Sequence, residues 1–163
     1  MGSCHSCFVK EKHEATMVKA HDQKFTHSYV VSYPAHELRT TSPLFQRTRR
    51  TLRSKYNCFI CGTRDKLEIH HFYIEHAAMF AIDWNKFGAF SMKHYNIQTN
   101  EFLGNFNWKD VAKNPELFVD SSANMIVLCK KHHTGCGGIH RIPFPIWILD
   151  KFSKKGQTFI KDT

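Results

Sequence analysis

The chain has 163 residues and a hydrophobic share of 42%, which is enough for one domain with a modest core. Its 23 Lys and Arg residues outnumber its 14 Asp and Glu residues, and the formal net charge of +9 favours polyanionic partners, above all nucleic acid. No stretch of about 18 apolar residues is present, which excludes a predicted membrane-spanning helix. The first residues are polar and lack the apolar core of a secretory signal. We therefore expect an intracellular protein of the cytoplasm or nucleoid, with reduced cysteines.

Residues 1–55 are expected to form an N-terminal arm followed by a basic helix. The arm, residues 1–38, is polar with little periodicity, apart from one predicted strand at 29–33. Ser42 precedes Pro43, as an N-cap precedes the first turn of a helix, and the following residues have helix-compatible spacing as far as Tyr56. The opening Met-Gly-Ser-Cys-His-Ser fits an N-myristoylation pattern, but so short a pattern has many chance matches. An untethered arm is the preferred interpretation.

A run of basic residues coincides with this predicted helix. Residues 39–55 contain six basic side chains and no acidic one. A solvated helix face is the ordinary interpretation of such a run. Beside the motifs described below, we expect the run to contact the phosphate backbone of nucleic acid, through Arg47, Arg49, Arg50, Arg53 and Lys55.

Hydrophobic periodicity and turn residues predict the remaining elements. In chain order these are a strand at Leu67–His71, a helix at 75–90, a loop or hairpin at 96–107, a short helix at 108–118 interrupted at Pro115, a strand at 125–128 that ends on Cys129, a glycine-rich turn at 130–140 and a closing helix or docking segment at 146–152. The aromatic side chains between 77 and 121 are expected in the core rather than on a base-stacking surface.

Two short cysteine motifs predict a structural zinc site. Cys58 and Cys61 form a CxxC pair, and Cys129 and His132 form a CxxH pair. Zn²⁺ takes four sulfur or nitrogen ligands in a tetrahedron, and two residues between ligands let a tight turn aim both side chains at one ion. Buried free cysteines are the alternative. The fourth ligand is open between His132, which we favour, and Cys136.

A second group of residues resembles the HNH nuclease family. His70 and His71 end a predicted strand, Asn124 precedes the next strand, and His133 and His140 follow the second zinc motif. The same order of a histidine pair, an Asn and terminal histidines occurs in that family, with zinc-binding pairs at corresponding places. The resemblance covers residues 56–142 and rests on these motifs.

The resemblance implies a role for each of these residues. His70 would bind a catalytic divalent cation, with His133 and His140 as further ligands, and the ion could be Mg²⁺, Mn²⁺, Ni²⁺ or Zn²⁺. His71 would be the general base that deprotonates water, and Asn124 would hold the loop that orients it. Adjacent strand residues point to opposite sides, so one histidine can face the ion while its neighbour approaches water if the strand end is distorted.

The expected fold class is α+β, with a ββα-metal core, structural zinc knuckles, an inserted helical segment and the basic N-terminal arm and helix. The core spans 56–142, with an insertion at about 77–121, because the gap between His71 and Asn124 is longer than the compact motif needs. Residues 143–163 form a C-terminal closing segment.

The expected function is hydrolysis of DNA phosphodiester bonds by a metal-dependent endonuclease. RNA remains open as the substrate, and a protein partner or an oligomer remains open as well. The alternative is a non-catalytic, zinc-stabilised nucleic-acid-binding module. Such a module would use the same cysteines and basic residues but has no need of His70, His71 and Asn124 together.

Overall fold

A computed structural model describes residues 42–142, 147, 151–152 and 155. The predicted strand at 29–33, the N-myristoylation pattern and most of the closing segment lie outside the described residues. Across the described part of the chain, no helix combines the length and the apolar character needed to cross a bilayer.

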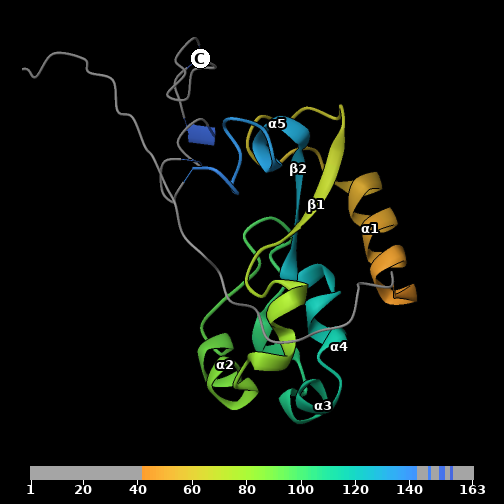
Figure 1. The fold of residues 1–163 in the computed structure, drawn as a ribbon, viewed down its shortest axis with the longest axis vertical. Helices are drawn as coiled ribbons and strands as arrows, with labels where there is room; N and C mark the ends of the chain where they lie inside the picture. Colours follow the sequence, from red (N-terminus) through yellow and green to blue (C-terminus); the bar gives the residue numbers. More distant parts are fainter. Residues whose placement is uncertain (1–41, 143–146, 148–150, 153–154, 156–163) are drawn as a thin grey trace, which may run out of the picture.

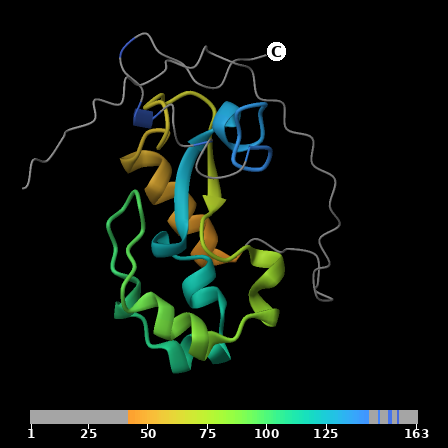
Figure 2. The same ribbon diagram turned by 90° about the vertical axis from the view of Figure 1, so that its left-hand side faces the viewer.

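The fold is α+β, as predicted. Two antiparallel strands, β1 (Leu67–His71) and β2 (Met125–Cys129), lie at the centre, with α1 along one side and α5 near one end (Figure 1). The segment between the strands forms the other end, where α2, α3 and α4 gather (Figures 1 and 2). The helical elements are α1 (Pro43–Lys55), η1 (His76–Ala81), α2 (Trp84–Ser91), η2 (Leu103–Asn105), α3 (Trp108–Lys113), α4 (Glu116–Val119), η3 (Ser122–Asn124) and α5 (Lys130–His133).

Helix α1 begins as its sequence predicts. The hydroxyl of Ser42 accepts a hydrogen bond from the Phe45 amide at 3.0 Å, and Pro43 occupies the first turn. At the other end, the Arg64 guanidinium donates to the Arg53 and Ser54 carbonyls, which have no partner within the helix. The helix turns its buried side chains toward the strands, and its five predicted phosphate-contacting side chains are exposed.

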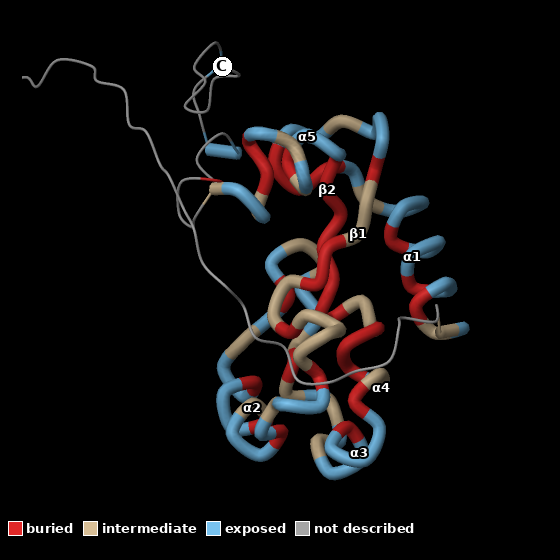
Figure 3. Tube along the Cα trace, viewed as in Figure 1, coloured by how far each residue is buried: buried red, intermediate tan, exposed pale blue. Residues whose placement is uncertain are grey.

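The strand register sets which side chains share a face. Leu67 pairs with Cys129 and His71 with Met125. Because strand side chains alternate, His71 shares the face of β1 that contacts α1, whereas His70 points to the opposite face. Every residue of β2 is buried (Figure 3). The strand lies in a core that also contains Phe45 and Leu52 of α1 and Trp147 from the C-terminal segment.

The free edge of β2 is closed by segments distant in sequence. The Phe59 amide donates to the Val127 carbonyl at 2.8 Å, and the Val127 amide donates to the side-chain oxygen of Gln98 at 2.7 Å. The amide nitrogen of Gln98 in turn donates to the Asn57 carbonyl at 2.9 Å. The outward-facing backbone amide and carbonyl at the centre of β2 are therefore both paired, although the sheet has only two strands.

The segment between the strands has a core of its own, whose buried members are Ile74, Met79, Trp84, Leu103, Val111, Phe118, Val119 and Ala123. The loop or hairpin expected at 96–107 is a turn closed by a single bridge between Tyr95 and Phe102 and followed by η2, and the break at Pro115 is confirmed by the separate helices α3 and α4.

Three predictions for the chain after β1 are wrong in detail. The helix expected at 75–90 is divided into η1 and α2, because Asp83 stops one and caps the other by accepting from the Asn85 and Lys86 amides. Phe80 and Phe90 are 66% and 42% exposed and so do not join the core. The glycine-rich turn expected at 130–140 begins instead with α5.

Asn96 joins this inserted segment to β2. Its side-chain nitrogen donates to the Ser122, Ala123 and Met125 carbonyls, and its oxygen accepts from the Gln98 and Thr99 amides, while the residue itself is 1% exposed. Buried polar groups of this kind stabilise a fold only while every partner is satisfied.

We predict that Asn96→Ala lowers the free energy of unfolding by about 3 kcal/mol, because it leaves buried carbonyls and amides without partners. Urea denaturation followed by circular dichroism measures this loss. The exposed Asn85 provides a matched control, since Asn85→Ala removes the same side chain from the surface of α2. Equal stability of the two variants would contradict this role for Asn96.

Candidate metal centres

Four side chains from two distant segments meet at one end of the strands. Cys58, Cys61, Cys129 and His132 each place one ligand atom within 4.8 Å of all the others. The Cys61 and Cys129 sulfurs are 3.9 Å apart, and Nδ1 of His132 lies 3.6 Å from the Cys58 sulfur and 3.3 Å from that of Cys129. Cys136 is exposed and lies outside this set.

A tight turn in each of the two segments directs its pair of side chains toward the same point. After Cys58 the chain turns back through Gly62, whose φ of 74° suits glycine and whose amide donates to the Cys58 carbonyl. Cys129 ends β2 and is the N-cap residue of α5, so His132 follows one helical turn later on the same side. The pairing of Leu67 with Cys129 then brings both pairs together.

These separations match a tetrahedral zinc site. Zn–S bonds of about 2.3 Å in a tetrahedron place sulfur atoms about 3.8 Å apart, close to the 3.9 Å between Cys61 and Cys129. The donor set of three thiols and one imidazole is also one that structural zinc takes. The cluster could therefore hold a structural metal ion such as zinc.

The pKa values of the Cys58 and Cys61 thiols are also consistent with a site that binds a cation. Burial raises the pKa of Cys58, but hydrogen bonds from His132 and from nearby backbone groups outweigh burial and lower that pKa to about 6. Burial raises the pKa of Cys61 to about 12, with a further contribution from the charges of Cys58 and Cys129. The metal-free cluster thus keeps a proton on one thiol while another ionises, and a bound dication would remove the repulsion that opposes full ionisation.

A second cluster consists of three imidazoles. His70 comes from β1, His133 ends α5 and His140 comes from the following turn, and their ligand nitrogens lie within 4.8 Å of one another. The Nε2 atoms of His133 and His140 are 3.1 Å apart. The chain folds back here at Gly138, where a Cβ would collide with the His133 carbonyl, so the position requires glycine.

Electrostatics keep His70 neutral. Burial lowers its pKa to about 3, and repulsion by positive charge on His140, His133 and His71 acts in the same direction. Burial and His133 also lower the pKa of His140. Neutral imidazoles carry the lone pairs that bind metal ions, so the cluster is suited to a cation.

Glu68 orients one of these imidazoles, and the sequence motifs did not reveal it. Its carboxylate lies 2.7 Å from Nδ1 of His133. A carboxylate can only accept hydrogen bonds, so Nδ1 of His133 carries the hydrogen, and a histidine that binds metal through its other nitrogen usually has a partner of this kind. Glu68 could have been found from its spacing in the sequence, because it lies two residues before His70 and therefore on the same face of β1.

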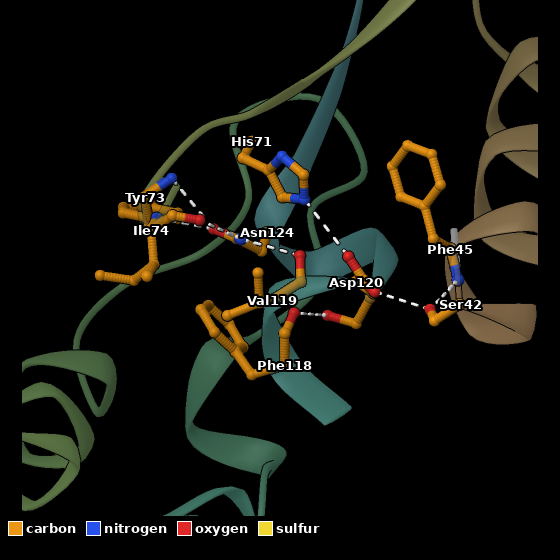
Figure 4. A network of polar contacts seen from close by, with 10 residues as sticks. Ser42, Phe45, His71, Tyr73, Ile74, Phe118, Val119, Asp120 and Asn124 are labelled. Carbon is orange, nitrogen blue, oxygen red and sulfur yellow. Dashed lines mark hydrogen bonds and ion pairs between the residues drawn. The ribbon is translucent and has the colours of Figure 1, made fainter. Parts of the chain in front are cut away.

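His71 follows His70 directly on β1 and so lies on the opposite face, where it is 6% exposed. Figure 4 shows its ring between Phe45 of α1 and Asp120. Its ring stacks on Phe45 with 5.9 Å between centroids, and its Nε2 lies 3.4 Å from Oδ1 of Asp120. Asp120 is 1% exposed and also accepts a hydrogen bond from the Ser42 hydroxyl at 2.7 Å. No sequence motif indicated Asp120.

Asn124 holds the chain just after His71. Its side-chain oxygen accepts from the Tyr73 and Ile74 amides at 3.0 Å, and its nitrogen donates to the Ile74 and Val119 carbonyls at 2.9 Å. The residue is fully buried, and Figure 4 shows these contacts beside His71. The structure thus places Asn124 against the loop that leaves β1.

Replacing a thiol of the first cluster tests whether it holds metal. We predict that Cys58→Ser lowers the zinc content by about one ion per chain and the free energy of unfolding by several kcal/mol, because a structural ion binds only the folded chain. Elemental mass spectrometry and urea denaturation measure the two effects. Cys136→Ser is the matched control and keeps both values. Unchanged zinc content in Cys58→Ser would rule out this site.

Comparisons with known proteins add no relative. No protein-family model matches the sequence, and no curated protein or solved structure matches it either. Functional inference therefore rests on the two side-chain clusters and the residues around them.

Proposed function

We propose that the protein is a metal-dependent endonuclease of the HNH type that hydrolyses phosphodiester bonds in DNA. In this proposal His70, His133 and His140 hold one catalytic divalent cation. Cys58, Cys61, Cys129 and His132 hold a separate structural zinc ion. His71 is the general base, and the two strands with α5 form the ββα-metal core.

One observation carries the proposal: three imidazoles converge on one point beside a separate cluster of three thiols and an imidazole. A soft thiolate set suits a closed structural site, whereas three histidines leave coordination positions for water and substrate. When bound there, a divalent cation would stabilise the negative charge on the phosphate and on the leaving oxygen.

The ring of His71, the proposed base, is fixed by contacts with its neighbours. The ring of His71 is stacked on Phe45 and bonded through Nε2 to Asp120, and its other nitrogen points away from Asp120 (Figure 4). That second nitrogen is the atom that takes a proton from water. Asn124 fixes the loop after β1 and so limits movement of the strand end.

The exposed face of α1 is the proposed contact with the nucleic-acid backbone. Arg49, Arg50 and Arg53 follow Gln46 by three, four and seven positions, so the four side chains share one face of α1 and line a surface pocket. The same helix packs Phe45 on His71, so a backbone bound along α1 would lie next to the element that supports the base.

A second candidate function is zinc-stabilised binding of nucleic acid without cleavage. The burial of His71, which is 6% exposed, favours it, because a general base must reach water. The two candidates agree on the zinc cluster and the basic helix, and they differ on the three-histidine cluster and His71.

A plasmid-nicking assay separates the two candidates. We predict cleavage with Mg²⁺, Mn²⁺, Ni²⁺ or Zn²⁺ that EDTA abolishes. His71→Ala is expected to slow cleavage by about 10²- to 10⁴-fold, since a general base contributes about that much, while DNA binding stays close to wild type. The melting temperature is expected to fall, because the variant loses the ring packed on Phe45 and the contact with the buried Asp120. His70→Ala is expected to lose cleavage as well.

His94→Ala is the matched control and keeps the wild-type rate, because His94 bonds the Phe90 carbonyl away from both clusters. Wild-type cleavage by His71→Ala would refute the assignment of the base. Binding of DNA with no cleavage under any of the four ions would favour the second candidate.

The α1 surface has its own test. We predict that Arg50→Gln weakens DNA binding about equally for all sequences and reduces the slope of log affinity against log salt by about 1, the effect of losing one phosphate contact. Fluorescence anisotropy at several salt concentrations measures the slope. Lys113→Gln, on α3 at the far end of the molecule, removes the same charge and keeps the slope (Figure 1). Equal slopes for both variants would exclude this surface.

A further inference from the structure

We infer that Asp120 is the positioning residue for His71. It fixes the neutral imidazole in the tautomer with hydrogen on Nε2 and the lone pair on Nδ1. The catalytic meaning of this inference rests on the proposed nuclease function, whereas the tautomer itself does not.

Asp120 reaches His71 from the segment inserted between the strands. It follows directly after α4, as the C-cap residue of that helix, and is 1% exposed. Its Oδ1 lies 3.4 Å from Nε2 of His71, which is itself 6% exposed. The separation is longer than the usual N–H···O range of about 2.7–3.2 Å, as catalytic contacts often are before substrate binds.

A carboxylate selects one tautomer of a neutral imidazole. An ionised carboxylate can only accept hydrogen bonds, so the nitrogen that faces it must carry the hydrogen. For His71 that nitrogen is Nε2, and the lone pair is left on Nδ1. Nδ1 points away from Asp120 in Figure 4, so the nitrogen able to take a proton is the one turned toward other surroundings.

Asp120 is held in place by a second contact. Its Oδ2 accepts a hydrogen bond from the Ser42 hydroxyl at 2.7 Å, and the same hydroxyl caps α1 by accepting from the Phe45 amide. Ser42 bonds to the carboxylate and not to the imidazole, so these three residues are not arranged as a serine nucleophile with its base.

The ring of His71 is confined on its flat side as well. Phe45 stacks on it at an interplanar angle of 17°, and Phe45 belongs to the first turn of α1, next to Ser42. One helix N-terminus therefore fixes both the carboxylate and the ring face. Rotation of the imidazole by half a turn would place a ring carbon, instead of Nε2, against the carboxylate of Asp120.

The tautomer can be read without any cleavage. ¹⁵N chemical shifts of the zinc-loaded full-length protein, in mildly alkaline buffer, distinguish a protonated from an unprotonated ring nitrogen. We expect His71 to show hydrogen on Nε2 and none on Nδ1. Hydrogen on Nδ1, or an even mixture of tautomers, would overturn the inference, and this measurement needs no variant to fold.

Substitution then tests the consequence. Asp120→Asn keeps the size but removes the negative charge and can turn either its amide oxygen or its amide nitrogen toward Nε2, so the preference for hydrogen on Nε2 should weaken. We expect kcat for plasmid cleavage to fall on the order of 10- to 100-fold, a part of what a general base supplies, with KM changed by less than about twofold because no substrate contact is removed.

Asp110→Asn is the control, since Asp110 is exposed on α3 and its carboxylate bonds Asn107. An unshifted spectrum together with an unchanged kcat in Asp120→Asn would overturn the positioning role. If the wild-type protein does not cleave under any metal, the proposed function fails, and the ¹⁵N spectrum still decides the pairing of Asp120 with His71.

Discussion

The antiparallel pairing of β1 with β2 is the constraint on which the rest of the structure depends. The register that pairs Leu67 with Cys129 brings the two cysteine motifs together, and the same register at His71 and Met125 places Asn124 beside the loop after β1. A slip by one residue would exchange the faces of β1 and send His70 toward α1. A bound structural ion would oppose such a slip, because Cys129 ends β2 and cannot move without leaving the thiol cluster.

Local patterns were sufficient to predict much of this arrangement. The two zinc motifs have short, regular spacing, so each pair is organised by one turn, and the N-cap and proline of α1 act within four residues. Both strands were predicted, the first from the alternation at Leu67–His71 and the second from the apolar run that ends at Cys129. The three histidines beside α5 were also predicted, from the order of histidine and asparagine residues along the chain, and the structure brings them together.

The contacts that sequence patterns missed are those between distant segments. Asp120 and His71 are separated by 49 positions, Glu68 and His133 by 65, and no periodicity links such pairs. Asn96 and Gln98 gave no signal because an isolated amide in a loop is common, and their importance comes from carbonyls and amides that arrive from elsewhere. The hydrophobic pattern alone predicted one helix at 75–90. Asp83 is the N-cap of α2, so a new helix begins there although the apolar pattern continues through it.

The central claim is that the chain holds two separate metal ions, one on thiols and one on imidazoles. Anomalous diffraction from crystals grown with Zn²⁺ tests it most directly. We expect two peaks per chain, one about 2.3 Å from the sulfurs of Cys58, Cys61 and Cys129 and the other about 2.1 Å from nitrogens of His70, His133 and His140. A thiol cluster without a peak, or imidazoles that remain without one at saturating metal, would show that the chain does not hold two ions.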